Sequence, residues 1–183
     1  MTRVALLLLG FAVALGLRVV VGGDEVARSQ KAGLLFAAAL LALALAARAR
    51  WNPSRRAVLI GLAGVLLVCA PVALESALTV RPLRSTEGFA VWALVVLVVA
   101  GSEELFLRGA LYDAAEQTWG VGAAIGLGAV VFALLHVPLY GWHVVPLDLA
   151  VGVVLGGLRQ GSGSVTAPLV THVGADWVGW FVS

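Results

Sequence analysis

The segment from Gly101 to Arg108 reads Gly-Ser-Glu-Glu-Leu-Phe-Leu-Arg and places three charged side chains inside an otherwise apolar stretch. An ionisable group at the centre of a bilayer costs at least about 2.5 kcal/mol, so such charges indicate a functional site. On a helix, Glu104 and Arg108 are four residues apart with the acid first, the better orientation for an ion pair. Glu103 lies about 100° away around the helix. We therefore expect a structural ion pair between Glu104 and Arg108, and a Glu103 that is free to act as a general base.

The composition around this segment is that of a polytopic membrane protein. Of the 183 residues, 61% are hydrophobic and 12% are charged, and the mean hydropathy is +1.03. A soluble domain is excluded by these values. The net charge of +2 does not indicate nucleic-acid binding, because four of the twelve basic residues fall in one short loop. Cys69 is the single cysteine, which excludes an internal disulfide and a thiolate metal cluster.

Apolar runs of helical length predict an all-α bundle of about seven membrane spans in one structural domain. The expected spans cover residues 4–22, 32–47, 57–74, 88–117, 121–137, 144–158 and 164–183. The fourth is about 45 Å long against a hydrocarbon core of about 30 Å, so its polar last third is expected to leave the membrane. Pro138 is expected to end the fifth span, and residues 75–87 to form an outer loop that turns at Arg81-Pro82.

The distribution of arginine predicts the orientation of the bundle. The loop around Asn52-Pro53 contains four arginines, Arg48, Arg50, Arg55 and Arg56. Cytoplasmic loops carry an excess of basic residues, so this loop and the N-terminus are expected on the cytoplasmic side.

Further titratable residues occur in the later spans. Glu103 and His136 lie about 16 residues before and after the same turn at Trp119-Gly120, so an antiparallel helix pair places them at the same depth. His172 and Asp176 are one helical turn apart in the last span. These four side chains suffice either to hold a divalent metal or to activate a water by hydrogen bonding. Asp148 has two open assignments, a partner for Arg108 or a residue lining the cavity.

The order of the motifs resembles the CPBP family of intramembrane proteases, which comprises type II CAAX prenyl proteases and bacteriocin-processing proteins. The matching residues are Glu103-Glu104-x-x-x-Arg108, Phe132-x-x-x-His136 and His172-x-x-x-Asp176, with Gly152-x-x-x-Gly156 and Pro168 as context. The resemblance covers residues 88–183 and leaves residues 1–87 as N-terminal transmembrane helices. Many members carry Asn at the position of Asp176, and the carboxylate here adds a charge.

The resemblance implies an intramembrane endopeptidase in which Glu103 activates the attacking water. His136, His172 and Asp176 would then hold the water, the oxyanion or a metal such as zinc, and both a metal-dependent and a metal-free mechanism remain open. The substrate would be a membrane-embedded or lipid-anchored protein or peptide. The implied location is the bacterial plasma membrane.

A non-enzymatic membrane protein is the rival hypothesis from another class. Intramembrane Glu, His and Asp chains also serve as proton relays in carriers, and an immunity or scaffold protein could use the same cavity. A carrier is expected to have two related halves. The first three spans have no counterpart of the charged motifs, which favours the enzyme.

Overall fold

The computed structural model describes residues 1–79 and 84–182, and these residues contain helices and no β-strand. The predicted all-α class is thus confirmed. The α-helices are α1 (Thr2–Gly22), α2 (Gln30–Ala46), α3 (Arg55–Thr79), α4 (Phe89–Glu104), α5 (Tyr112–Trp119), α6 (Val121–Tyr140), α7 (Val145–Ser162) and α8 (Thr166–Val182). Short segments between them are η1 (Gly23–Glu25), the π-helical η2 (Leu105–Leu111) and η3 (Trp142–Val144).

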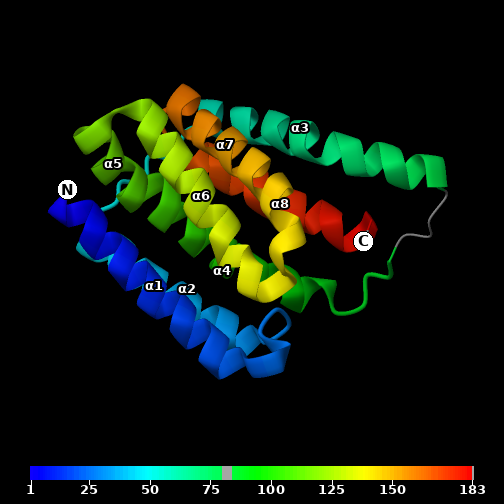
Figure 1. Ribbon diagram of the computed structural model, residues 1–183. Helices are drawn as coiled ribbons and strands as arrows, with labels where there is room; N and C mark the ends of the chain where they lie inside the picture. Colours follow the sequence, from blue (N-terminus) through cyan, green and yellow to red (C-terminus); the bar gives the residue numbers. More distant parts are fainter. Residues whose placement is uncertain (80–83, 183) are drawn as a thin grey trace.

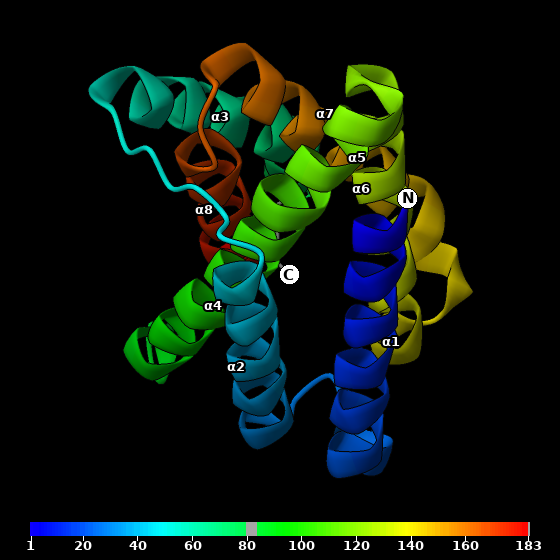
Figure 2. The ribbon, with the colours of Figure 1, turned by 90° about the vertical axis from the view of Figure 1, so that its left-hand side faces the viewer.

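The helices form one bundle with two outer layers. Helices α1 and α2 form a hairpin on one side, and α3 lies on the opposite side (Figure 1). The hairpin packs on α4 and η2, whereas α3 packs on α8 and α7. Helices α4 to α8 fill the space between these layers (Figure 2). The polar motifs of the sequence therefore lie in the middle of the bundle.

Four helical segments in the described chain are long and apolar enough to cross a membrane: Thr2–Glu25, Phe89–Trp119, Val121–Tyr140 and Trp142–Ser162. Helix α2 is a shorter apolar helix. Large apolar side chains such as Leu9, Leu66 and Leu94 are each more than 60% exposed. In water so many exposed apolar side chains would be costly, whereas lipid is their natural surrounding.

Three predicted helix ends are wrong. Helix α7 was expected to end at residue 158 and runs to Ser162. Helix α6 continues through Pro138 to Tyr140 and stops at Gly141, whose φ of 93° suits glycine. A proline in the last turn removes a single backbone hydrogen bond, so the helix can pass it. Helix α3 runs on to Thr79 and includes Glu75, which was expected in a loop. The predicted turn at Arg81-Pro82 lies outside the described residues.

The long fourth span is continuous but changes its helical type. Helix α4 leads into η2 directly after Glu104, and α5 follows without a break to Trp119. A π-helix bonds each residue to the fifth one before it, and such segments are frequent at functional sites. Every residue of η2 after Leu105 is buried. The polar last third therefore stays helical, and its Tyr112 is buried against the rest of the bundle.

Helices α6 and α7 approach closely at a glycine. A Cβ atom on Gly152 would lie 2.7 Å from the Cα atom of Ala129, which leaves no room for a side chain. Small residues at such crossings let membrane helices pack backbone to backbone. The close approach also brings the Gly152 carbonyl to the centre of the bundle, where Arg108 binds it.

Candidate active site

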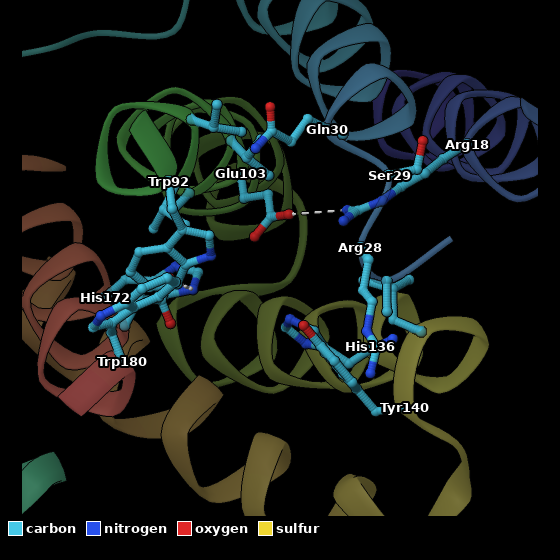
Figure 3. Close-up of a pocket in the computed structure, with 18 of the residues that line it drawn as sticks. Arg18, Arg28, Ser29, Gln30, Trp92, Glu103, His136, Tyr140, His172 and Trp180 are labelled. Carbon is cyan, nitrogen blue, oxygen red and sulfur yellow. Dashed lines mark ion pairs between the residues drawn. The ribbon is translucent and has the colours of Figure 1, made fainter. Parts of the chain in front are cut away.

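A cavity of about 400 Å³ lies inside the bundle and contains all four predicted site residues. Its polar lining includes Glu103 from α4, His136 from α6, and His172 and Asp176 from α8. Figure 3 shows Glu103, His136 and His172 around this space. Helices far apart in the sequence therefore bring together the groups that the motifs single out.

Glu103 has a cation partner that the sequence analysis missed. The Oε1 atom of Glu103 lies 3.6 Å from Nη1 of Arg18, which comes from α1 (Figure 3). Both side chains are more than 90% buried. The expectation that Glu103 is unpaired is thus wrong, because the N-terminal hairpin packs against α4 and delivers a guanidinium to the cavity.

Glu104 forms a buried network through one carboxylate oxygen, while its Oε2 has no hydrogen-bond partner among the described residues. Its Oε1 accepts a hydrogen bond from Nη1 of Arg108 at 2.7 Å and lies 2.8 Å from Nδ1 of His172. Nη2 of Arg108 donates to the Gly152 carbonyl at 3.3 Å. Glu104 and Arg108 are at most 1% exposed. The structure therefore contains the predicted ion pair and adds His172 to it.

His136 is oriented by its own helix and by an aromatic ring. Its Nδ1 lies 3.1 Å from the Phe132 carbonyl, which can only accept a hydrogen bond, so Nδ1 carries the proton. The Phe132 ring meets the imidazole edge-on at 4.7 Å between centroids. Asp148 lies 3.4 Å from the same Nδ1. Neither open assignment of Asp148 holds, because its partner is His136 and it does not line the cavity.

His172 lies between two carboxylates. Nδ1 contacts Glu104, and Nε2 lies 3.7 Å from Oδ2 of Asp176, whose side chain is 39% exposed. The Phe132 ring also packs edge-on against this imidazole, at 5.2 Å between centroids. One aromatic ring thus fixes both histidines from the inner side of the cavity.

The donor groups of the cavity bear on the metal hypothesis. Within residues 1–79 and 84–182, no three His, Cys, Asp or Glu side chains are placed to hold one metal ion. His136 Nδ1 contacts the Phe132 carbonyl and His172 Nδ1 contacts Glu104, so Nε2 is the nitrogen of each ring that is left to act as a ligand. Because no such group of three is found among the described residues, the mechanism proposed below uses no metal step.

Aromatic and basic side chains complete the wall and the mouth of the cavity. The rings of Trp92 and Trp180 pack at a tilt of 40° with centroids 4.8 Å apart, and Tyr140 stacks on His136. Arg28 and Arg84 line the outer part, where Arg84 covers the Trp180 ring at 3.7 Å. Motif spacing gave no sign of these wall residues. The sequence could have indicated Arg18, because a charge within the first apolar run is costly in lipid unless it has a partner.

The comparisons with known proteins concern the second half of the chain. The family model described as type II CAAX prenyl endopeptidase Rce1-like matches residues 85–178, which is just over half of the sequence. No curated protein and no solved structure is significantly similar to the chain. The matched segment contains every motif quoted above and excludes α1, α2 and α3.

Proposed function

Because this integral membrane protein belongs to the Rce1-like family of type II CAAX prenyl endopeptidases, we propose that it hydrolyses a peptide bond of a membrane-associated protein or peptide. The observation that carries the proposal is the shared cavity of Glu103, His136, His172 and Asp176. A general base, two imidazoles and a second carboxylate around one buried space are the groups that hydrolysis of an amide requires.

In the proposed reaction, Glu103 takes a proton from a water in the cavity as the water oxygen attacks the scissile carbonyl carbon. The electron pair of the C=O bond moves onto oxygen and gives a tetrahedral intermediate. When this intermediate collapses, the C–N bond breaks and the leaving nitrogen takes the proton from Glu103. The unprotonated Nε2 of His136 is available to orient the water, since Nδ1 holds the proton.

His172 and Asp176 complete the arrangement on the α8 side of the cavity. The Glu104 carboxylate fixes the ring of His172 through Nδ1, which directs Nε2 toward Asp176. The buried network of Glu104 and Arg108 takes no part in proton transfer in this scheme. It joins the C-terminal end of α4 to His172 within α8, so that the cavity keeps its shape.

We further propose that the protein resides in a bacterial plasma membrane with the N-terminus in the cytoplasm. The arginine-rich loop between α2 and α3 supports this orientation, because the loop and the start of α1 lie at the same end of the bundle, where Arg3 donates to the Ala47 carbonyl.

A proteomic comparison tests the proposed activity. Membranes that carry the intact protein are compared with membranes that carry Glu103→Ala, and new protein termini are identified by terminal labelling. We expect termini that appear with the intact protein and are lost with the variant. Identical sets of termini would contradict the protease and favour the carrier or scaffold.

The metal hypothesis has a separate test. Purified protein is analysed for bound transition metals and assayed after exhaustive chelation. Full hydrolysis without metal is the expected result for a water activated by Glu103. Stoichiometric zinc and loss of hydrolysis on chelation would replace that mechanism by a metal-dependent one.

A further inference from the structure

Arg18 is a buried cation near the C-terminal end of α1, outside the family match. It belongs to α1, which lies outside the matched residues 85–178. The residue is only 7% exposed, and its guanidinium lies 4.9 Å from the centre of the Phe36 ring. It lines the same cavity as Glu103. A buried charged side chain in an apolar helix is costly and therefore indicates a function.

Two of the three guanidinium nitrogens of Arg18 carry donors that no acceptor in the described residues binds. Nε and Nη1 are buried and have no hydrogen-bond partner among the residues that the structure describes. Glu103 lies at 3.6 Å, within ion-pair distance but not hydrogen-bonded. A guanidinium with a structural role is satisfied, as Arg108 is by Glu104 and the Gly152 carbonyl. Arg108 thus has acceptors for its guanidinium, whereas Arg18 lacks them at Nε and Nη1. A ligand in the cavity would supply the missing acceptor.

The imidazoles of the cavity are poorly placed to serve as fixed donors. His136 uses its Nδ1–H on the Phe132 carbonyl, which leaves Nε2 as an acceptor in the neutral ring. His172 has its Nδ1 at the Glu104 carboxylate, which accepts a hydrogen bond from the ring proton, so Nε2 of the neutral ring is likewise an acceptor. Arginine keeps its charge and all its N–H groups at any physiological pH. Next to Glu103, Arg18 thus offers donors that do not depend on a protonation state.

We propose that Arg18 stabilises the oxyanion of the tetrahedral intermediate, an inference that rests on the proposed hydrolysis with Glu103 as base. In the ground state the guanidinium faces the negative charge of Glu103. During attack, Glu103 accepts the proton of the water and becomes neutral, while the carbonyl electron pair creates a negative oxygen. The negative charge moves from the partner of Arg18 to the substrate. A fixed cation at this point interacts more strongly with the transition state, which is the requirement for catalysis.

The simpler alternative is that Arg18 only ties α1 to α4. The two roles predict different kinetics. A tie would affect folding and substrate binding, whereas an oxyanion donor affects kcat with little change in KM. A soluble guanidinium ion can replace a deleted arginine side chain inside a cavity. It would not restore activity that was lost because a structural contact between α1 and α4 was removed.

The first stage of the test uses the full protein in membranes, with terminal labelling of the proteome. The variants are Glu103→Gln, Arg18→Gln and, as a control, Arg3→Gln, which removes an arginine from the other end of α1. We expect the new termini to persist with Arg3→Gln and to disappear with the other two. Loss with Glu103→Gln but not with Arg18→Gln overturns the role of Arg18 alone. Persistence with Glu103→Gln overturns the proposed function itself.

The second stage uses purified protein and a synthetic peptide that spans the cleaved bond. We expect Arg18→Gln to lower kcat by about 10²- to 10³-fold, the effect of removing one oxyanion donor, with KM changed less than twofold. Guanidinium chloride at millimolar concentration should restore part of kcat in Arg18→Ala but not in Glu103→Gln. Arg18→Lys keeps the charge and is expected to fold, and it should lose about tenfold or more in kcat. An unchanged kcat in Arg18→Lys and Arg18→Gln, or a loss that guanidinium does not rescue, would overturn the proposal.

Discussion

Glu103 and Glu104 are adjacent in the sequence and occupy opposite environments. Glu104 is fully enclosed, and one oxygen binds both Arg108 and His172 at 2.7 and 2.8 Å. Glu103 faces the cavity, where its nearest cation, Arg18, lies 3.6 Å away without a hydrogen bond. One carboxylate is committed to the protein, and the other remains available to a water or a substrate.

The difference teaches how one helix can combine support and chemistry. A buried ion pair with good geometry resists change, because removal of either partner leaves an uncompensated charge. A looser pair beside a cavity can exchange its partner during a reaction. Adjacent positions on α4 and the residues that face them thus separate the two tasks by about 100° of rotation.

The largest expected effect comes from removing Arg108, the buried cation partner of Glu104. Arg108→Ala leaves Glu104 enclosed with His172 as its remaining partner, and we expect a loss of about 3–5 kcal/mol in the free energy of unfolding. Glu103→Ala should cost much less, because Arg18 then faces a cavity that admits water. The measurement is the folded, monodisperse yield of each variant from membranes. Equal yields would contradict the division into structural and catalytic glutamates.

We expect both histidines to be needed for hydrolysis but only one of them to be needed for stability. His136→Ala and His172→Ala should both lose hydrolysis of the identified substrate, by about 10²-fold or more. Only His172→Ala should also lower stability, by about 1.5–3 kcal/mol, because it removes a hydrogen bond to the charged Glu104. Thermal unfolding in detergent measures this second effect. A His136→Ala protein that unfolds as early as His172→Ala would show that both rings are structural.

The smallest expected effect concerns Asp176. Its carboxylate is 39% exposed and lies 3.7 Å from His172, too far for a hydrogen bond. We expect Asp176→Asn to retain partial hydrolysis, with a loss of about tenfold or less, since a charged partner exceeds a neutral one by roughly 1 kcal/mol. The melting temperature should stay unchanged. Complete inactivation would show that the Asp176 carboxylate is as necessary for hydrolysis as Glu103.

Much of this arrangement follows from residue spacing. The i, i+4 rule predicted the Glu104–Arg108 pair and the contact of Phe132 with His136. Equal distances from the turn at Trp119-Gly120 predicted that Glu103 and His136 meet, and both line the cavity. These are local rules or simple helix geometry, which a sequence carries directly.

The errors arose where a contact depends on packing between distant segments. No spacing rule relates Arg18 to Glu103, because the angle between the α1–α2 hairpin and α4 sets their distance. Asp148 was expected near Arg108 or in the cavity and instead faces His136, because Arg108 is satisfied by Glu104 and the Gly152 carbonyl. Pro138 was expected to end a helix, but a proline one turn from the end is tolerated.

The π-helical segment η2 changes how distances along this chain convert into directions. A helical wheel that starts at Glu103 assumes a constant angle of about 100° per residue, and this phase no longer holds after Leu105. A shift of one residue within 105–111 would leave hydropathy and composition almost unaltered. It would still rotate α5 enough to turn Tyr112 away from Gln160 and Asp113 away from Arg159, to which they are bonded at 2.6 and 2.9 Å. The length of this short segment therefore sets the rotational position of α5 relative to α7. A single-residue insertion there would be almost invisible in a hydropathy profile and would break both contacts.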